Sequence, residues 1–276
     1  MNAILTIEDL ALAQATNTGL VDECFSMVTV EKDLEEYLLW LYQDEVEVTV
    51  TSTLNRSRKR SLGLHPSSAC KNKVCLLKLY YECTGEIEPH RAYSQRDHLT
   101  WDTGTLLHDT FQGHFKEMYG EQFEDEVKLV DDELHLKSRT DGIFSFTRVR
   151  FVLEAKSIKE AGNFGWEKVQ KKPMKDNVRQ SYFYMFMADV PFALIFYMNK
   201  NAGLFKEHAV MFDQEVWDEI VKEIVQPVVE AAYNEGQMVP ATPGYGCRWC
   251  DYNYRCKAAS KEKAHVKGSS KPWGKR

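Results

Sequence analysis

Long hydrophobic segments are missing from this sequence. The longest apolar run covers residues 192–198 and is far too short to cross a bilayer. No Lys or Arg precedes Lys32, so the chain lacks the basic start of a secretion signal. Its seven cysteines occur without such a signal, which favours a reducing compartment and thiols used in metal binding or redox chemistry. We therefore expect a cytoplasmic protein with no membrane partner.

The sequence also lacks a surplus of positive charge, since its formal net charge is −6. Residues 257–276 hold seven Lys or Arg and one acid, which leaves −12 for residues 1–256. An acidic body argues against unspecific coating of duplex DNA but leaves room for a local basic groove. A basic run in residues 51–61 is ordinarily a solvated loop, and it becomes a candidate DNA-binding segment if the chain acts on DNA. Its basic residues are Arg56, Arg58, Lys59 and Arg60.

A chain of 276 residues with 43% hydrophobic and 28% charged residues fits one large domain with a helical appendage. Residues 1–61 are predicted to form a helical subdomain and the basic linker. Residues 62–240 are the predicted core, and residues 241–257 a cysteine-bearing segment. Residues 258–276 contain almost nothing apolar and are predicted to be a basic disordered tail.

The core is expected to follow the order α-βββ-α-ββ-α. Ser67 or Ser68 is expected to cap a helix that carries Cys75. The other predicted elements are helices at 101–119, 176–188 and 214–234, a short helix within 158–175, and strands at 123–130, 191–199 and 203–212.

Residues 139–156, RTDGIFSFTRVRFVLEAK, carry the strongest chemical signal. Two runs rich in β-branched and aromatic residues flank residues 147–148, which predicts a hairpin with its turn there. In that register Asp141 faces Glu154. Lys156 points to the same face as Glu154 because side chains alternate along a strand.

Two carboxylates on facing strand residues lie about 5 Å apart and repel each other. Their hydrophobic neighbours indicate a buried sheet, where repulsion costs more. A divalent cation between Asp141 and Glu154 removes this penalty, and the Lys156 ammonium can hold a water or a phosphate oxygen beside it. The alternative is a solvated strand face on which these charges merely lie side by side.

Cysteines near the end of the chain form the second strong feature. Cys247 and Cys250 have the C-x2-C spacing that grips one metal centre, and Cys256 supplies a third thiolate. The preferred fourth ligand is Cys75, because it opens a predicted helix whose apolar stripe fixes its position. Cys70 is the alternative. Spacing does not distinguish a four-cysteine zinc site from an iron–sulfur cluster.

In this order, these residues resemble the PD-(D/E)XK nucleases, specifically the RecB-like and AddB-like branch that carries an iron–sulfur cluster. That branch includes CRISPR-associated and phage-encoded exonucleases. The resemblance implies an α/β (α+β) fold with a mixed central sheet of the restriction-endonuclease-like type flanked by helices. The matching positions are Cys75, Gly104 with His108, Asp141, Glu154-Ala155-Lys156, Gln180 with Tyr184, and Cys247, Cys250 and Cys256.

The resemblance also implies a role for each residue. Lys156 positions or activates the attacking water, and Gln180 and Tyr184 orient the catalytic strand or contact DNA. The implied ligands of Mg²⁺ or Mn²⁺ are His108, Asp141 and Glu154. The implied ligands of a [4Fe–4S] cluster are Cys75, Cys247, Cys250 and Cys256.

The expected function is therefore that of a metal-dependent DNA nuclease, an exonuclease acting on DNA ends or single strands in the cytoplasm of a bacterial or phage-infected cell. One alternative is a non-catalytic nucleic-acid-binding protein with a structural four-cysteine metal site. A redox enzyme is disfavoured because the sequence has no G-x-G-x-x-G dinucleotide fingerprint.

Overall fold

A mixed five-stranded sheet forms the centre of the molecule. The computed structural model describes residues 36–37, 61–87, 89, 95–160, 165–234 and 236–256. The strand order is β1-β4-β5-β6-β7, with β5 and β6 parallel and the other neighbours antiparallel. The strands are β1 (Phe123–Asp125), β4 (Gly142–Ser145), β5 (Arg150–Ile158), β6 (Phe192–Asn199) and β7 (Leu204–Met211). A separate hairpin pairs β2 (Lys128–Asp131) with β3 (Leu136–Arg139).

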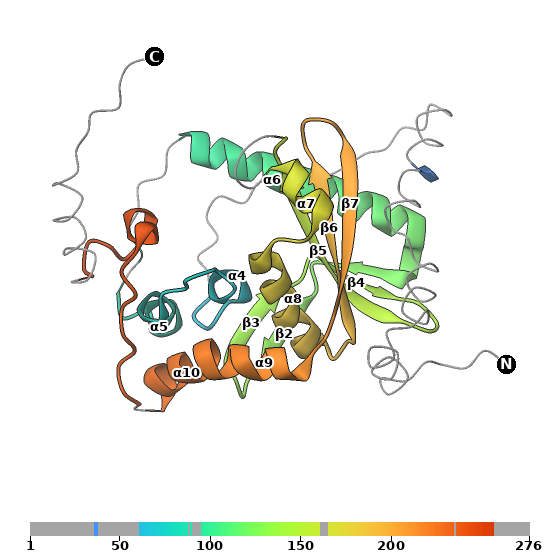
Figure 1. Ribbon diagram of the computed structural model, residues 1–276. Coiled ribbons are helices and arrows are strands. Elements are labelled where there is room, and N and C mark those ends of the chain that lie inside the picture. Colours follow the sequence, from blue (N-terminus) through green and yellow to red (C-terminus); the bar gives the residue numbers. More distant parts are fainter. Residues whose placement is uncertain are drawn as a thin grey trace, which may run out of the picture.

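Helices flank the sheet, as Figure 1 shows, so the predicted mixed sheet between helices is confirmed. The α-helices are α4 (Pro66–Ala69), α5 (Leu76–Thr84), α6 (Gln95–Tyr119), α7 (Trp166–Lys171), α8 (Lys175–Ala188), α9 (Gln214–Ile220) and α10 (Gln226–Tyr233). Shorter helical turns are η1 (Gly120–Gln122), the π-helical η2 (Val221–Val225) and η3 (Tyr245–Trp249).

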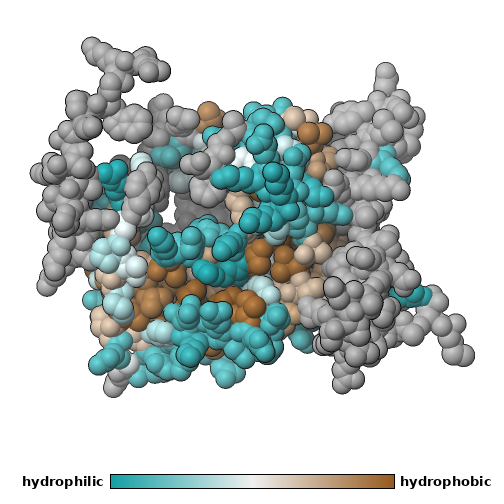
Figure 2. Space-filling view, in the orientation of Figure 1, coloured by the Kyte–Doolittle hydropathy of each residue, from teal (hydrophilic) through white to brown (hydrophobic). Residues whose placement is uncertain are grey.

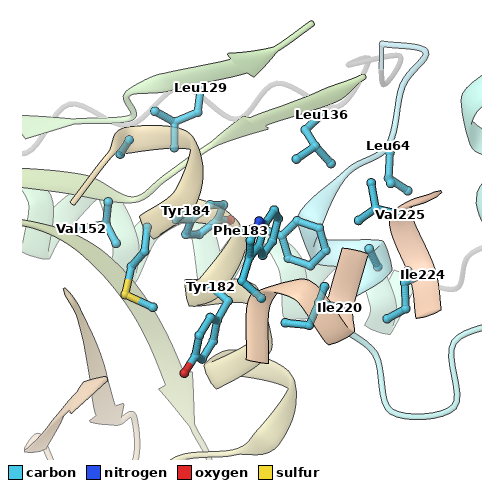
Figure 3. Close-up of a cluster of buried hydrophobic side chains, with 14 of the residues drawn as sticks. Leu64, Leu129, Leu136, Val152, Tyr182, Phe183, Tyr184, Ile220, Ile224 and Val225 are labelled. Atoms are coloured by element: carbon cyan, nitrogen blue, oxygen red, sulfur yellow. The ribbon is translucent and has the colours of Figure 1, made fainter. Parts of the chain in front are cut away.

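Alternation along β5 divides the core between the two faces of the sheet. Phe151 and Leu153 pack with Phe115 of α6 in one aromatic cluster. Val152 lies in the other cluster, with Phe183 of α8 and side chains from α9, η2 and the β2–β3 hairpin (Figure 3). Because Glu154 is two residues after Val152, its side chain points to the α8 face.

Two sequence-based boundaries are wrong, each for a local backbone reason. Ser67 and Ser68 do not cap the helix of Cys75 but lie inside α4, since Pro66 starts that helix and Lys73, at φ 57°, separates it from α5. The predicted strand 123–130 is two strands, because Glu126 has a left-handed φ of 51°. The predicted helix 214–234 is present as the continuous run of α9, η2 and α10, and its π-helical turn lies directly before Pro227, which has no amide hydrogen for the carbonyl four residues earlier.

Some predictions fall on parts of the chain outside the described residues. These include the basic run Arg56, Arg58, Lys59 and Arg60, the tail 258–276, and the helices expected before residue 61, apart from helical Glu36 and Tyr37. The division into four regions therefore stays a prediction. Within the described residues, no helix combines the length and apolar character needed to cross a bilayer.

Close packing around β4 leads to a stability prediction. A Cβ added at Gly142 would lie 2.6 Å from Cζ of Phe123 and 3.2 Å from the carbonyl oxygen of Glu124. Gly142→Ala is expected to lower the free energy of unfolding by about 1–3 kcal/mol in urea titrations. Gly113→Ala is the control, since a Cβ there meets nothing within 4 Å in the middle of α6. The control should raise the same free energy by about 0.5–1 kcal/mol, and equal effects would contradict the packing argument.

Candidate active site

The hairpin of β4 and β5 has the register that the sequence predicts. Gly142 pairs with Leu153, and Phe146 and Val149 exchange backbone hydrogen bonds at the turn. Pairing with β4 ends at Leu153, whereas β5 continues beside β6 as far as Ile158. The last part of β5 therefore has one open edge, and the candidate site lies along it.

Asp141 occupies this open edge, directly before β4. Its Oδ2 accepts a 2.7 Å hydrogen bond from the backbone N–H of Ala155, so the carboxylate takes the place of a further strand residue. Its Oδ1 lies 3.6 Å from Nδ1 of His108, which α6 supplies from the other face of the sheet. Lys156 Nζ is 3.9 Å from Oδ2. Three side-chain and backbone groups that are distant from Asp141 in sequence thus surround its carboxylate.

One of the two backbone carbonyls beside Glu154 faces the site. The carbonyl of Leu153 accepts a 2.9 Å hydrogen bond from the buried hydroxyl of Thr140. The carbonyl of Ala155 accepts a 3.1 Å hydrogen bond from Lys156 Nζ instead. The Ala155 carbonyl is therefore the one directed toward the cluster of charged groups.

Glu154 is fully buried, with 0% of its surface exposed. Its Oε1 forms an ion pair with Lys156, and its Oε2 accepts a 3.1 Å hydrogen bond from Gln180 Nε2. The same Gln180 nitrogen donates to the hydroxyl oxygen of Tyr184 at 2.6 Å. A solvated strand face is therefore the wrong interpretation of this carboxylate. Gln180 and Tyr184, one turn apart on α8, instead brace it.

The two carboxyl groups differ in how readily they ionise. Burial raises the pKa of Glu154 to about 7, although the charge of Lys156 opposes the rise. Burial also acts to raise the pKa of Asp141, but the charges of Lys156 and His108 outweigh it and leave that pKa below its usual value. Burial likewise opposes the charged form of His108, and Asp141 outweighs it and raises the His108 pKa. The two carboxyl groups therefore differ because burial dominates at Glu154, whereas nearby cations dominate at Asp141.

Cys70 is a member of this site that sequence reasoning missed, since we considered it only as an alternative cluster ligand. Its buried thiol donates to Gln180 Oε1 at 3.8 Å, and its carbonyl accepts from Arg179 at 3.5 Å. With Oε1 facing the thiol, the amide nitrogen of Gln180 points at Glu154. No sequence signal pairs residues 110 positions apart, and only the packing of α4 on α8 reveals the contact.

The predicted cluster thiols lie on two segments, with Cys75 at the start of α5 and Cys247, Cys250 and Cys256 in and after η3. Cys75 is the N-cap of α5, and its sulfur accepts a 3.4 Å hydrogen bond from the N–H of Thr242. The sulfur of Cys247 accepts another from Gly244, also at 3.4 Å.

The remaining two cysteines, Cys250 and Cys256, lie close enough to the start of α5 to interact electrostatically with groups there. Burial raises the pKa of Cys250, and the charge of Cys75 adds to the rise. Burial also raises the pKa of Tyr81, with contributions from Cys256 and Cys75. Cys70, the alternative to Cys75, lies at the carboxylate site, and the choice of Cys75 as a cluster ligand stays a prediction. In the part of the chain that the structure describes, no three His, Cys, Asp or Glu side chains are arranged closely enough to hold a metal ion.

Comparisons with known proteins give only distant structural similarities. No protein-family model matches the chain, and no curated protein matches its sequence. The solved structure of SSO0001 aligns with a TM-score of 0.44 and 14% identity, over 87% of this chain and 98% of that one. The alkaline exonuclease LHK-Exo from Laribacter hongkongensis aligns with a TM-score of 0.46 and 14% identity, over 63% of this chain and 89% of that one. Its complex with dAMP gives 0.44 and 17% over the same shares. The functional assignment therefore rests on the residues of this chain.

The environments of the thiols predict which of them react. Burial raises the pKa of Cys70 to about 11 and that of Cys83 to about 12, so both are protonated and shielded at pH 8. In native, metal-free protein, iodoacetamide should leave both unmodified while it alkylates the more exposed Cys75 and Cys247, as peptide mass spectrometry would show. All four should react in urea. Rapid alkylation of native Cys70 would contradict its place beside Gln180.

Proposed function

We propose that this chain is a metal-dependent deoxyribonuclease that hydrolyses phosphodiester bonds. The observation that carries the proposal is the convergence of Asp141, Glu154 and Lys156 at the open edge of β5, with Glu154 buried and braced by Gln180. Two carboxylates and an ammonium at one point are the groups that phosphodiester hydrolysis needs to hold a cation and an attacking water.

The donor set fits Mg²⁺ or Mn²⁺. Asp141, Glu154 and the carbonyl of Ala155 offer the oxygen ligands that hard divalent cations prefer, and the imidazole of His108 is a ligand that Mn²⁺ accepts. Asp141 and Glu154 both lie near the one ammonium of Lys156, so their carboxylates are close together, and a bound divalent cation would offset the repulsion between them. When bound, the ion would supply positive charge for the phosphoryl oxygens and a more acidic water.

The remaining roles in hydrolysis belong to side chains of the protein. Lys156 pairs with both carboxylates, so it stays protonated and acts by donating hydrogen bonds to the attacking water or to a phosphate oxygen. Gln180 and Tyr184 fix the carboxylate of Glu154, which keeps it aimed at the site. The family resemblance adds DNA ends or single strands as the substrate and an exonuclease as the type of enzyme, in a bacterial or phage-infected cytoplasm.

We further propose that Cys75, Cys247, Cys250 and Cys256 hold a [4Fe–4S] cluster with a structural role. Backbone N–H groups already point at the sulfurs of Cys75 and Cys247, as they do around thiolate-bound clusters. The cluster would tie α5 to the last described segment of the chain, closing a long loop and stabilising the fold.

Substitutions at the carboxylate site test the catalytic proposal. Asp141→Ala, Glu154→Ala and Lys156→Ala should each lower hydrolysis of end-labelled DNA with Mg²⁺ or Mn²⁺ by about 100-fold or more, because each removes charge from the reacting centre. Asp132→Ala, on an exposed turn, is the control and should keep full activity.

Circular dichroism would confirm that each variant folds. Nuclease activity that survives any two of the three substitutions would overturn the site assignment. Binding of DNA without any cleavage by the wild type would favour the non-catalytic alternative.

The cluster proposal has its own test. Anaerobically purified protein should be brown and contain about four irons per chain. Cys250→Ala should remove the iron and lower the Tm by about 5 °C or more, because it opens the closed loop. Cys70→Ala is the matched control and should keep its iron. One zinc and no iron would replace the cluster with a zinc site, and no metal at all would remove the proposal.

A further inference from the structure

A row of exposed basic residues lies beside the candidate site and has no role in it. We call it the basic ridge, and its members are Lys168, Lys171, Lys172, Lys175 and Arg179. The lysines are exposed, and no salt bridge within the described part of the chain involves any of them. Against Glu167 and Asp176 on the same two helices, these five basic residues leave a net charge of +3, and in an acidic protein such a concentration of positive charge favours a polyanionic partner.

Buried contacts hold the basic ridge in place. Trp166 and Val169 of α7 are buried against Ile195 and Tyr197 of β6, so the basic side of α7 faces outward. Figure 2 shows this outward surface as hydrophilic, above the centre of the view. The hydroxyl of Tyr197 accepts a 2.9 Å hydrogen bond from the N–H of Met174, which fixes the turn between α7 and α8. The charges are therefore held in one place rather than carried on a loose loop.

The segments of chain directly before and after the basic ridge both carry residues of the candidate site. β5 carries Glu154 and Lys156 and leads toward α7, while Arg179 directly precedes Gln180, whose amide donates to Glu154. The turn after α4 adds more positive charge at the α8 end, where the N–H of Asn72 bonds Asp176 and Arg179 donates to the carbonyl of Lys71. Asp176 is thereby engaged, and Lys71 lies beside the ridge.

Acidic residues face the α8 end of the basic ridge across a groove. A groove of about 250 Å³ separates α8 from α9, with Lys175 and Arg179 on one wall and Glu219 and Glu223 on the other. Phosphates are repelled from that wall, so a polyanion following the ridge is directed along α7 and toward Gln180.

We propose that the basic ridge binds the phosphate backbone of the DNA strand and guides it to the site of hydrolysis. This inference rests on the proposed nuclease function. Lysines at this spacing contact phosphates as point charges without reading bases, so the binding is expected to be independent of sequence and sensitive to salt.

The test compares two triple variants with the same change in net charge. The ridge variant is Lys168→Gln, Lys171→Gln and Lys172→Gln, and the control is Lys116→Gln, Lys137→Gln and Lys222→Gln, all exposed lysines away from α7. Both are made in an Asp141→Ala background with Mg²⁺, so that labelled DNA stays intact while its binding is followed by fluorescence anisotropy. If all three contacts are lost, the slope of log K against log salt should fall by about 2–3 for the ridge variant only. Between 50 and 200 mM salt, the parent should therefore lose about 16- to 64-fold more affinity than the ridge variant.

Hydrolysis by the same triple variants with Asp141 intact separates the ridge from the catalytic proposal. The ridge variant should show a raised KM and an unchanged kcat, and the control should match the wild type. Equal salt slopes for the two variants would overturn the proposal that the basic ridge binds DNA, even if the wild type cleaves DNA. A wild type that neither binds nor cleaves DNA would overturn both proposals.

Discussion

The fully buried carboxylate of Glu154 is the constraint on which the rest of the site depends. A lone charge at 0% exposure would be very costly, and the fold surrounds it with Lys156 and Gln180. Gln180 is in turn held by Tyr184 and by the thiol of Cys70. The helices α4 and α8 therefore act together to aim one carboxylate, which links the packing of that face directly to the chemistry proposed for it.

The sheet brings the rest of the site together by ending one strand early. Because β4 stops pairing at Leu153, the N–H of Ala155 is left for the carboxylate of Asp141, and the Ala155 carbonyl faces the charged cluster. Alternation along β5 sends Glu154 toward α8, while α6 delivers His108 from the opposite side. These groups thus meet where side chains from both faces of the sheet reach the open edge of β5.

The two proposed metal centres have different structural settings. The carboxylate site is built into the sheet and braced by buried hydrogen bonds, whereas the thiols lie where α5 meets the last described segment. The first setting suits an ion that takes part in chemistry, and the second suits a centre that joins distant parts of the chain. The basic ridge lies next to the first, on elements that continue from it in sequence.

The sequence by itself determined the local and periodic features of this protein. Two apolar runs around a polar turn were enough to predict the hairpin register, and with it the shared face of Glu154 and Lys156, because pairing and alternation in a strand are local. The helix after Cys75 followed from the same kind of pattern, whereas the predicted order of three strands before α7 is five in the structure, because 123–130 divides into β1 and β2 and β3 was not predicted.

Only the tertiary structure decided which groups from other elements surround the residues of this hairpin. It placed His108 beside Asp141, the thiol of Cys70 against Gln180, and the buried side of α7 against β6, the strand next to β5. It also divided two predicted elements, at the left-handed φ of Lys73 and at that of Glu126. Contacts across more than a hundred residues depend on how whole helices pack on a sheet, and no local property of the sequence specifies that packing.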